Sequence, residues 1–203
     1  MGVVWCFMTE LRAQKISTRC WKCREPVSGP ICSSCATIRP PPADADLFAV
    51  LAFPRRYFFE KSALDSVYRK VSRKVHPDRY IGKSAVERRM SLQWTALVNE
   101  ARRILRDPLR RARYLATGLT SPPEEGGTVL DPVFLEDIFD MQIEASSDPT
   151  GVHGRAAALR DAILAELDTT FTRWEADEGD LSEVAERLDR LKYITNVLNL
   201  TTA

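Results

Sequence analysis

The sequence has little of what marks membrane proteins or polyanion binders. No apolar run approaches the roughly 20 residues that a membrane-spanning helix needs. The 29 basic and 28 acidic side chains leave a net charge of only +1 over 203 residues, which argues against a dedicated nucleic-acid binder. Because 44% of the residues are apolar, the chain can bury one or two modest cores, and we expect a soluble globular protein.

The amino-terminal stretch MGVVWCFM carries no convincing targeting signal. It is too short and too poorly flanked for a signal peptide. A myristoylation site prefers Ser or Thr at position six, where this chain has Cys6. We therefore expect an intracellular protein.

Four of the five cysteines form two CxxC pairs, Cys20 with Cys23 and Cys32 with Cys35, separated by eight residues. Two such pairs can complete the tetrahedron of thiolates that holds Zn²⁺. A module of about 20 residues has almost no apolar core, so a metal would have to supply its folding free energy. Cys6 stands alone, and we expect it to be a spare thiol.

A disulfide pair and a thioredoxin-like redox motif are the alternatives for these cysteines. Redox CxxC motifs usually occur singly beside a βαβ pattern, which this sequence lacks. We therefore expect one structural Zn²⁺ in a module within residues 1–39. Three consecutive prolines then predict a stiff linker over residues 40–45.

Beyond the linker the apolar spacing is helical. Asp46 can cap a short helix, and Ser62-x-x-Asp65 is typical of a capping box at the start of the next one. That helix has one apolar stripe at helical spacing: Leu64, Val67, Tyr68, Val71 and Val75. Four basic side chains lie on its opposite face or at its flank: Arg69, Lys70, Arg73 and Lys74. Ser84-x-x-Glu87 then opens a longer helix, whose apolar residues can pack antiparallel against this stripe.

His76-Pro77-Asp78 connects these two helices. Pro77 disfavours helical geometry at the preceding residue and cannot donate to the helix, so His76 and Asp78 should project from a loop. The basic residues alone could be an ordinary solvated face. Two antiparallel helices joined by His-Pro-Asp, however, resemble the J domain of DnaJ-type co-chaperones. The other histidine, His153, is expected in a glycine-rich turn.

The resemblance implies that this segment docks onto a heat-shock-type chaperone ATPase and accelerates its ATP hydrolysis. His76, Pro77 and Asp78 match the J-domain tripeptide residue by residue. The basic side chains match only as a patch: Arg69, Lys70, Arg73 and Lys74. Arg79 stands where many J domains have lysine, which keeps the charge but changes the shape. A catalytic role for His76 is not expected.

Segments on both sides of this hairpin indicate a particular group of J-domain proteins. DLFAVLAFPRRY, LRDPLRRARYL and TVLDPVFLEDIFDMQIE, in this order, resemble the iron–sulfur co-chaperones of the HscB/Jac type. Some members of that family also carry a tandem CxxC module at the amino end. The likeness covers nearly the whole chain, and it implies a J domain over residues 46–119 and a scaffold-binding domain over residues 128–203.

The carboxy-terminal region should form three helices. Asp131-Pro132 caps the first, and two more are expected at about Gly154–Ala176 and Leu181–Leu200. The first helix has a core stripe at helical spacing: Phe134, Ile138, Met141 and Ala145. Its other apolar residues lie roughly 100–180° away around the helix: Leu135, Phe139 and Ile143. In the third helix, Tyr193 points away from the core stripe.

From the residues alone, this second set is equally a sandwiched core or a binding face. The family resemblance favours a binding face, because its members hold the iron–sulfur scaffold protein on the outside of this bundle. Leu135, Phe139 and Tyr193 match the apolar contacts of the family, and Asp140 matches an acidic one. Ile143 is included in the expected face, although the family often has an acid there.

We therefore expect an all-α, L-shaped co-chaperone with a zinc module, a J-domain antiparallel helical hairpin and a three-helix bundle, and not an enzyme. Its expected partners are a heat-shock-type chaperone ATPase and an iron–sulfur cluster scaffold protein, without nucleic acid or membrane. Weak self-association stays open. The expected compartment is the bacterial cytoplasm, or the mitochondrial matrix in a eukaryote.

Three other functions remain as alternatives. A general J-domain protein for unfolded clients would need no fixed apolar patch on the bundle. A nucleic-acid-binding protein could use the cysteines and the arginines of RRILRDPLRRAR, and its affinity would fall steeply with salt. A redox enzyme would have thiols that titrate as a two-electron couple.

Overall fold

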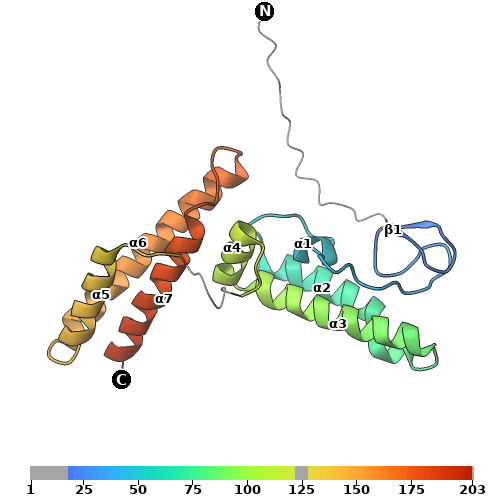
Figure 1. The fold of residues 1–203 in the computed structure, drawn as a ribbon, viewed down its shortest axis with the longest axis horizontal. Coiled ribbons are helices and arrows are strands. Elements are labelled where there is room, and N and C mark those ends of the chain that lie inside the picture. Colours follow the sequence, from blue (N-terminus) through green and yellow to red (C-terminus); the bar gives the residue numbers. More distant parts are fainter. Residues whose placement is uncertain (1–17, 122–127, 203) are drawn as a thin grey trace, which may run out of the picture. The chain divides into compact units, whose positions relative to one another are not determined.

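The structure is a computed structural model that describes residues 18–121 and 128–202 (Figure 1). Cys6 and the amino-terminal stretch discussed above lie outside the described residues. Within them the chain is helical apart from two short strands, so the expected all-α fold with a small cysteine module is confirmed. None of the described helices is long and apolar enough to cross a bilayer.

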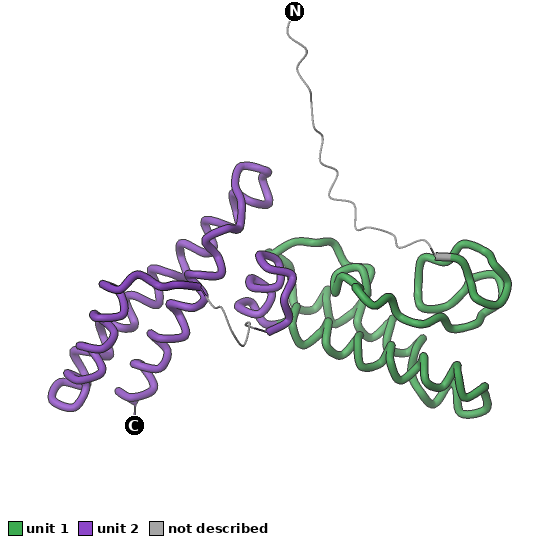
Figure 2. The backbone as a smooth tube through the Cα atoms, in the orientation of Figure 1, with its two compact units in different colours: residues 1–106 green, residues 107–203 purple. Residues whose placement is uncertain are grey.

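The chain divides into two compact units, residues 1–106 and residues 107–203 (Figure 2). The first unit contains the cysteine module and a helical hairpin. The second contains the carboxy-terminal helices together with the helix that follows Asp107.

The cysteine module opens the first unit. Strand β1 (Thr18–Arg19) pairs antiparallel with β2 (Pro26–Val27), with Arg19 opposite Pro26. An isolated bridge between Ile31 and Ile38 closes the second half of the module. We call residues 18–39 the metal module.

Four helical elements complete the first unit: α1 (Leu47–Val50), α2 (Lys61–Val75), the 3-10 helix η1 (Pro77–Tyr80) and α3 (Ala85–Arg106). Helices α2 and α3 lie side by side as an antiparallel hairpin, and α1 packs against α3 (Figure 1). The fully buried residues of the hairpin include Leu64, Val75, Val98, Ala101, Ile104 and Leu105. The expected hairpin is therefore present.

Two of the three predicted helix starts in this unit are confirmed, and one is wrong. Asp46 caps α1 by accepting from the Ala49 amide at 3.0 Å, and Ser84 and Glu87 form the expected capping box before α3. The expected capping box of Ser62 and Asp65 is wrong, because α2 already begins at Lys61. The Asp65 carboxylate instead accepts from Arg102 Nε at 2.9 Å, which ties α2 to α3.

The second unit consists of α4 (Pro108–Thr117), α5 (Pro132–Glu144), α6 (Pro149–Glu175) and α7 (Val184–Thr201). Asp107 and Asp131 cap α4 and α5 as expected, and Gly118 ends α4 with a positive φ of 73°. Helices α5 and α7 both pack against α6, and α4 packs against α7. The expected three-helix bundle is therefore present.

Helix α4 differs from the expectation, because it packs with the second unit although the J domain was expected to extend to residue 119. Arg113 of α4 forms an ion pair with Asp189 of α7 at 2.6 Å, and both side chains are largely buried. Such a pair is hard to read from a sequence, because its members are 76 residues apart. The domain limits themselves stay a prediction.

Two helix starts in the bundle also differ from the expectation. Helix α6 begins at Pro149, because the Asp148 carboxylate accepts from the Gly151 amide at 2.9 Å and caps it. His153 consequently lies in a helix and not in a turn, with its Nδ1 2.9 Å from the Thr201 hydroxyl. Helix α7 begins at Val184 and not at Leu181, since Asp180 bonds Ser182 in the preceding turn.

Candidate functional site

His76, Pro77 and Asp78 form a rigid turn after α2, which we call the HPD corner. Helix α2 ends at Val75 as expected, and the connection to α3 is ordered as the 3-10 helix η1, which begins at Pro77 and has His76 as its N-cap. The His76 Nδ1 atom accepts from the Asp78 amide at 3.3 Å. The side chains of His76 and Asp78 are 51% and 78% exposed, so both can reach a partner.

The basic residues before the corner form an exposed surface. Arg69, Lys70, Arg73 and Lys74 are all exposed, and we call them the basic face. They lie on the last turns of α2, directly before His76. Arg79, one residue beyond the corner, is exposed as well. Five exposed cations therefore lie within the stretch from Arg69 to Arg79 that contains the corner.

The two CxxC loops of the metal module have the same backbone geometry. In the first, the Arg24 amide donates to the Cys20 carbonyl oxygen at 2.9 Å; in the second, the Ala36 amide donates to Cys32 at 2.9 Å. Both residues that follow the second cysteine of a pair, Arg24 and Ala36, have positive φ angles, of 67° and 55°. This shared turn directs the sulfur atoms of each pair toward one point.

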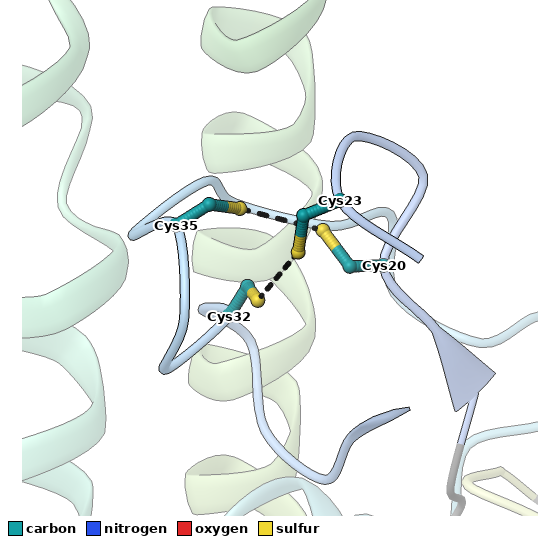
Figure 3. A group of neighbouring side chains, drawn as sticks. All are labelled: Cys20, Cys23, Cys32 and Cys35. Atoms are coloured by element: carbon teal, nitrogen blue, oxygen red, sulfur yellow. Dashed lines mark hydrogen bonds between the residues drawn. The ribbon is translucent and has the colours of Figure 1, made fainter. Parts of the chain in front are cut away.

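The four sulfur atoms face one another at the centre of the module (Figure 3). Cys20 Sγ lies 3.6 Å from Cys35 Sγ, and Cys23 Sγ lies 3.5 Å from Cys32 Sγ. All four lie within 4.8 Å of one another, and all four thiols are free. Four sulfurs at about 2.3 Å from a Zn²⁺ ion lie about 3.8 Å apart, so this spacing fits a tetrahedral metal site.

The module favours ionised thiols at some positions and not at others. The hydroxyl and amide of Thr37 donate to Cys35 and lower the pKa of that thiol to about 6. Amides of Cys35 and Ser34 lower the pKa of Cys32. The Glu25 amide favours the Cys23 thiolate, but burial and hydrogen bonds with the other thiols outweigh it and raise the pKa of Cys23 to about 12. Amide donors aimed at sulfur suit thiolates that bind a metal.

The second set of apolar residues in the bundle is exposed. Leu135, Phe139, Ile143 and Tyr193 are 38%, 61%, 60% and 40% exposed, whereas Ile138 and Met141 on the other side of α5 are buried. We call these four residues, with the exposed Asp140, the apolar face. One side of α5 is thus buried and the other is exposed, as the helical spacing of its apolar residues predicts.

Tyr193 lies on α7, one helical turn beyond Arg190, which contacts α5. The Arg190 guanidinium of α7 lies over the ring of Phe134, 5.2 Å from its centre. This turn of α7 is therefore next to the first turn of α5. Residues three apart on a helix are neighbours on its surface, which puts Tyr193 one turn further along. Because α5 and α7 are each joined to α6 by a chain reversal, they run in the same direction. Tyr193 is therefore near the level of Leu135 and Phe139.

Sequence reasoning missed two hydrogen bonds that support these sites. The Ser91 hydroxyl donates to the Val75 carbonyl oxygen at 2.6 Å, and the Trp94 indole N–H donates to the Arg39 carbonyl oxygen at 2.6 Å. A serine at a core position of a helix was a usable signal, because such a hydroxyl needs a buried partner. The Trp94 indole N–H was a second signal of the same kind.

Comparisons with known proteins identify the family. No family model matches the chain. It is 33% identical over 153 residues to "Co-chaperone protein HscB homolog" of Bordetella pertussis, covering 73% of this chain and 89% of that protein. The chain belongs to the HscB family of co-chaperones. The HscB homolog of Cupriavidus taiwanensis is 40% identical over 160 residues, covering 75% of this chain and 89% of that protein.

Solved HscB structures have the same fold. The crystal structure of human HscB has a TM-score of 0.70 at 26% identity and covers 91% of this chain and 97% of that one. HscB from Vibrio cholerae has a TM-score of 0.58 at 24% identity and covers 78% of this chain, a likeness of fold alone. The family relation expected from the sequence is confirmed.

Proposed function

We propose that this protein is a co-chaperone in iron–sulfur cluster biogenesis, whose HPD corner stimulates a heat-shock-type chaperone ATPase. The observation that carries the proposal is the exposed HPD corner at the end of a basic helix, in a chain of the HscB family. The protein would act in the compartment that holds its partners, which is the cytoplasm in a bacterium.

The geometry supports two separate contributions to docking. All four side chains of the basic face are exposed, so their charges would steer the approach of an acidic partner surface and speed association. The HPD corner has a fixed backbone, so its two exposed side chains would supply specific contacts without a large ordering cost. We therefore expect the basic face to set the rate of association with the chaperone ATPase. His76 and Asp78 would produce the stimulation of its ATP hydrolysis.

The bundle would hold the iron–sulfur cluster scaffold protein through its apolar face. Exposed aromatic and aliphatic side chains of this kind are the usual anchors of a protein interface, and an acidic neighbour such as Asp140 adds specificity at its rim. The fixed cluster on α5 and α7 also favours this function over that of a general J-domain protein, which would need no such surface.

The metal module would hold one structural Zn²⁺ through Cys20, Cys23, Cys32 and Cys35. The four free thiols and their amide donors support this assignment. The metal would supply folding free energy to a segment with a very small apolar core.

The test of the proposal is the substitution His76→Gln, with His153→Gln as a matched control in the bundle. The His76 variant should lose stimulation of the chaperone ATPase and keep its melting temperature, whereas the control should stimulate normally. Lys70→Ala and Arg73→Ala should each weaken stimulation in part, and more visibly at low salt, because exposed charges are screened. Full stimulation by the His76 variant would remove the co-chaperone function.

A further inference from the structure

The HPD corner leaves carbonyl groups at the end of α2 without their helical donors. Pro77 has no N–H to give to the Arg73 carbonyl oxygen, and the amides of the next two residues turn elsewhere. The Asp78 amide turns to His76 Nδ1 at 3.3 Å, and the Arg79 amide turns to the His76 carbonyl oxygen at 3.0 Å. In a continuing helix these two amides would bond the carbonyl oxygens of Lys74 and Val75. Both oxygens therefore need donors from elsewhere.

Side chains from two other elements supply these donors. The Tyr80 hydroxyl, on η1, donates to the Lys74 carbonyl oxygen at 3.2 Å. The Ser91 hydroxyl, on α3, donates to the Val75 carbonyl oxygen at 2.6 Å. The Thr95 hydroxyl lies 3.4 Å from the same oxygen but only 2.9 Å from the Ser91 carbonyl oxygen, so its contact with Val75 is secondary.

The bond from Ser91 to Val75 is completely buried. Both residues have no exposed surface, and Tyr80 is only 5% exposed. Water cannot replace a donor at such a site, so losing the Ser91 hydroxyl would leave the buried Val75 carbonyl oxygen with only the long contact to Thr95. The Ser91 hydroxyl thereby fixes the last residue of α2, directly before the corner, to α3.

We propose that Ser91 is a positioning residue, which holds the HPD corner in the conformation that binds the chaperone ATPase. This inference rests on the proposed function. A corner that is ordered before binding loses less conformational entropy in the complex. Ser91 therefore sets the affinity of docking, whereas His76 and Asp78 touch the partner and set the stimulation reached at saturation.

The substitution Ser91→Ala separates these two effects. The half-saturating concentration for stimulating the chaperone ATPase of the source organism should rise about fivefold, the factor expected for one neutral hydrogen bond. The maximal stimulation should stay the same. Ser91→Cys keeps a weak donor and should recover part of the affinity. Thr95→Val leaves the Ser91 bond in place and should change the half-saturating concentration by less than about twofold.

Val98→Ala is the matched control. Val98 is fully buried on α3, about two turns beyond Ser91, and does not contact the corner through a hydrogen bond. Shortening it should lower the melting temperature at least as much as Ser91→Ala and leave the half-saturating concentration unchanged. If Ser91→Ala does not fold, Ser91→Cys carries the same comparison with Val98→Ala.

Amide hydrogen exchange provides a readout without the partner. The Arg79 amide, bonded to His76, should exchange faster in Ser91→Ala than in Val98→Ala. An unchanged half-saturating concentration in Ser91→Ala, or an equal rise in Val98→Ala, would overturn the positioning role. If the wild-type protein stimulates no chaperone ATPase, the proposed function fails, and the exchange of the Arg79 amide still decides whether Ser91 holds the corner.

Discussion

The metal module and the carboxy-terminal bundle achieve their stability by opposite means. The apolar cluster around the cysteines of the module consists of Cys20, Val27 and Cys32, with two further cysteines packed against it, and Ile38 is buried as well. The bundle buries long rows of apolar side chains, among them Phe171 and Ile194, which have no exposed surface. Each such side chain stabilises the fold by about 1.5–3 kcal/mol. The bundle can therefore fold by packing, whereas we expect the module to need a ligand.

The module is nevertheless attached to the helical hairpin. The segment before the proline-rich linker is held between two indoles: Trp21 donates to the Ile38 carbonyl oxygen at 2.8 Å, and Trp94 donates to that of Arg39 at 2.6 Å. Trp94 belongs to α3 and is buried. A ligand bound by the cysteines should consequently affect the hairpin, but not the bundle.

The largest expected effect is loss of the metal. The double substitution Cys23→Ser and Cys32→Ser should remove stoichiometric Zn²⁺ from the purified protein, since structural sites of this type contribute on the order of 10 kcal/mol. Far-UV circular dichroism should change little, because the helices lie outside the module. Metal analysis and circular dichroism on the same samples test both statements.

Ser33→Ala with Ser34→Ala is the matched control for that experiment. These exposed residues lie between the two cysteines of the second pair, and their loss should leave the metal in place. Stoichiometric zinc in the cysteine variant would exclude the four-cysteine site. A large loss of helix would mean that helices outside the module also need the metal in order to fold.

Acid should release the metal from the module while the bundle stays folded. Metal binding requires thiolates, so the Cys23 thiol, with its pKa of about 12, must lose its proton at neutral pH. Below about pH 6 the Cys35 thiol is also protonated in the metal-free module, so one more proton must leave. For each proton that zinc binding releases, the affinity of the module for Zn²⁺ should fall by about tenfold when the pH is lowered by one unit. The fall should be steeper below pH 6. Competition with a chelator between pH 7.5 and 5.5 measures this slope, and a flat profile would contradict it.

The two sides of the bundle should respond differently to truncation. Phe171→Ala removes a fully buried ring and should lower the free energy of unfolding by about 3–5 kcal/mol. The triple variant Leu135→Ala, Phe139→Ala and Tyr193→Ala should melt within a few degrees of wild type. It should still stimulate the ATPase through His76 and lose detectable binding to the scaffold protein, because interface anchors each contribute about 2 kcal/mol or more.

Thermal melts and a direct binding assay with purified scaffold protein distinguish these outcomes. If the triple variant unfolds, its three side chains belong to the core, and the binding face lies elsewhere. If it folds and still binds, the proposed scaffold contact is wrong although the exposure of the side chains is right.

Trp94→Phe should break the connection between the module and the hairpin. It leaves the buried Arg39 carbonyl oxygen without the indole donor, at a cost of about 1–3 kcal/mol. Metal removal should destabilise the hairpin of the wild-type protein more than that of the variant, and a thermodynamic cycle over metal and mutation measures this coupling. Trp174→Phe, on α6, is the matched control and should show no coupling to the metal. Equal effects in both variants would mean that the module and the hairpin are independent.

Much of the fold follows from signals that are local in the sequence. Asp46, Ser84, Asp107 and Asp131 precede helices as expected, and the apolar spacing of α5 separates its buried side from its exposed one. The two CxxC pairs likewise predict four neighbouring sulfurs. Each of these features depends on residues a few positions apart, or on a motif whose geometry is intrinsic.

The errors arose where distant residues compete with a local signal. Asp65 matched a capping box, but Arg102 on the facing helix binds its carboxylate. The glycines around His153 suggested a turn, but Asp148 caps a helix that includes them. No local pattern predicts which partner such a charge will find.

The smallest expected effect compares one substitution in the two regions. Ala36 has a φ angle of 55°, in the left-handed region that disfavours a residue with a Cβ atom. Ala36→Gly should therefore favour the folded module by about 0.5–1 kcal/mol, reduced somewhat by the greater freedom of glycine in the unfolded chain. Ala162 is exposed within helix α6, where glycine costs about 1 kcal/mol. Ala36→Gly should thus tighten zinc binding to the module by about twofold, whereas Ala162→Gly should lower the melting temperature of the bundle. Chelator competition and thermal melts measure the two effects, and weaker zinc binding by Ala36→Gly would mean that the strained turn does not limit the metal site.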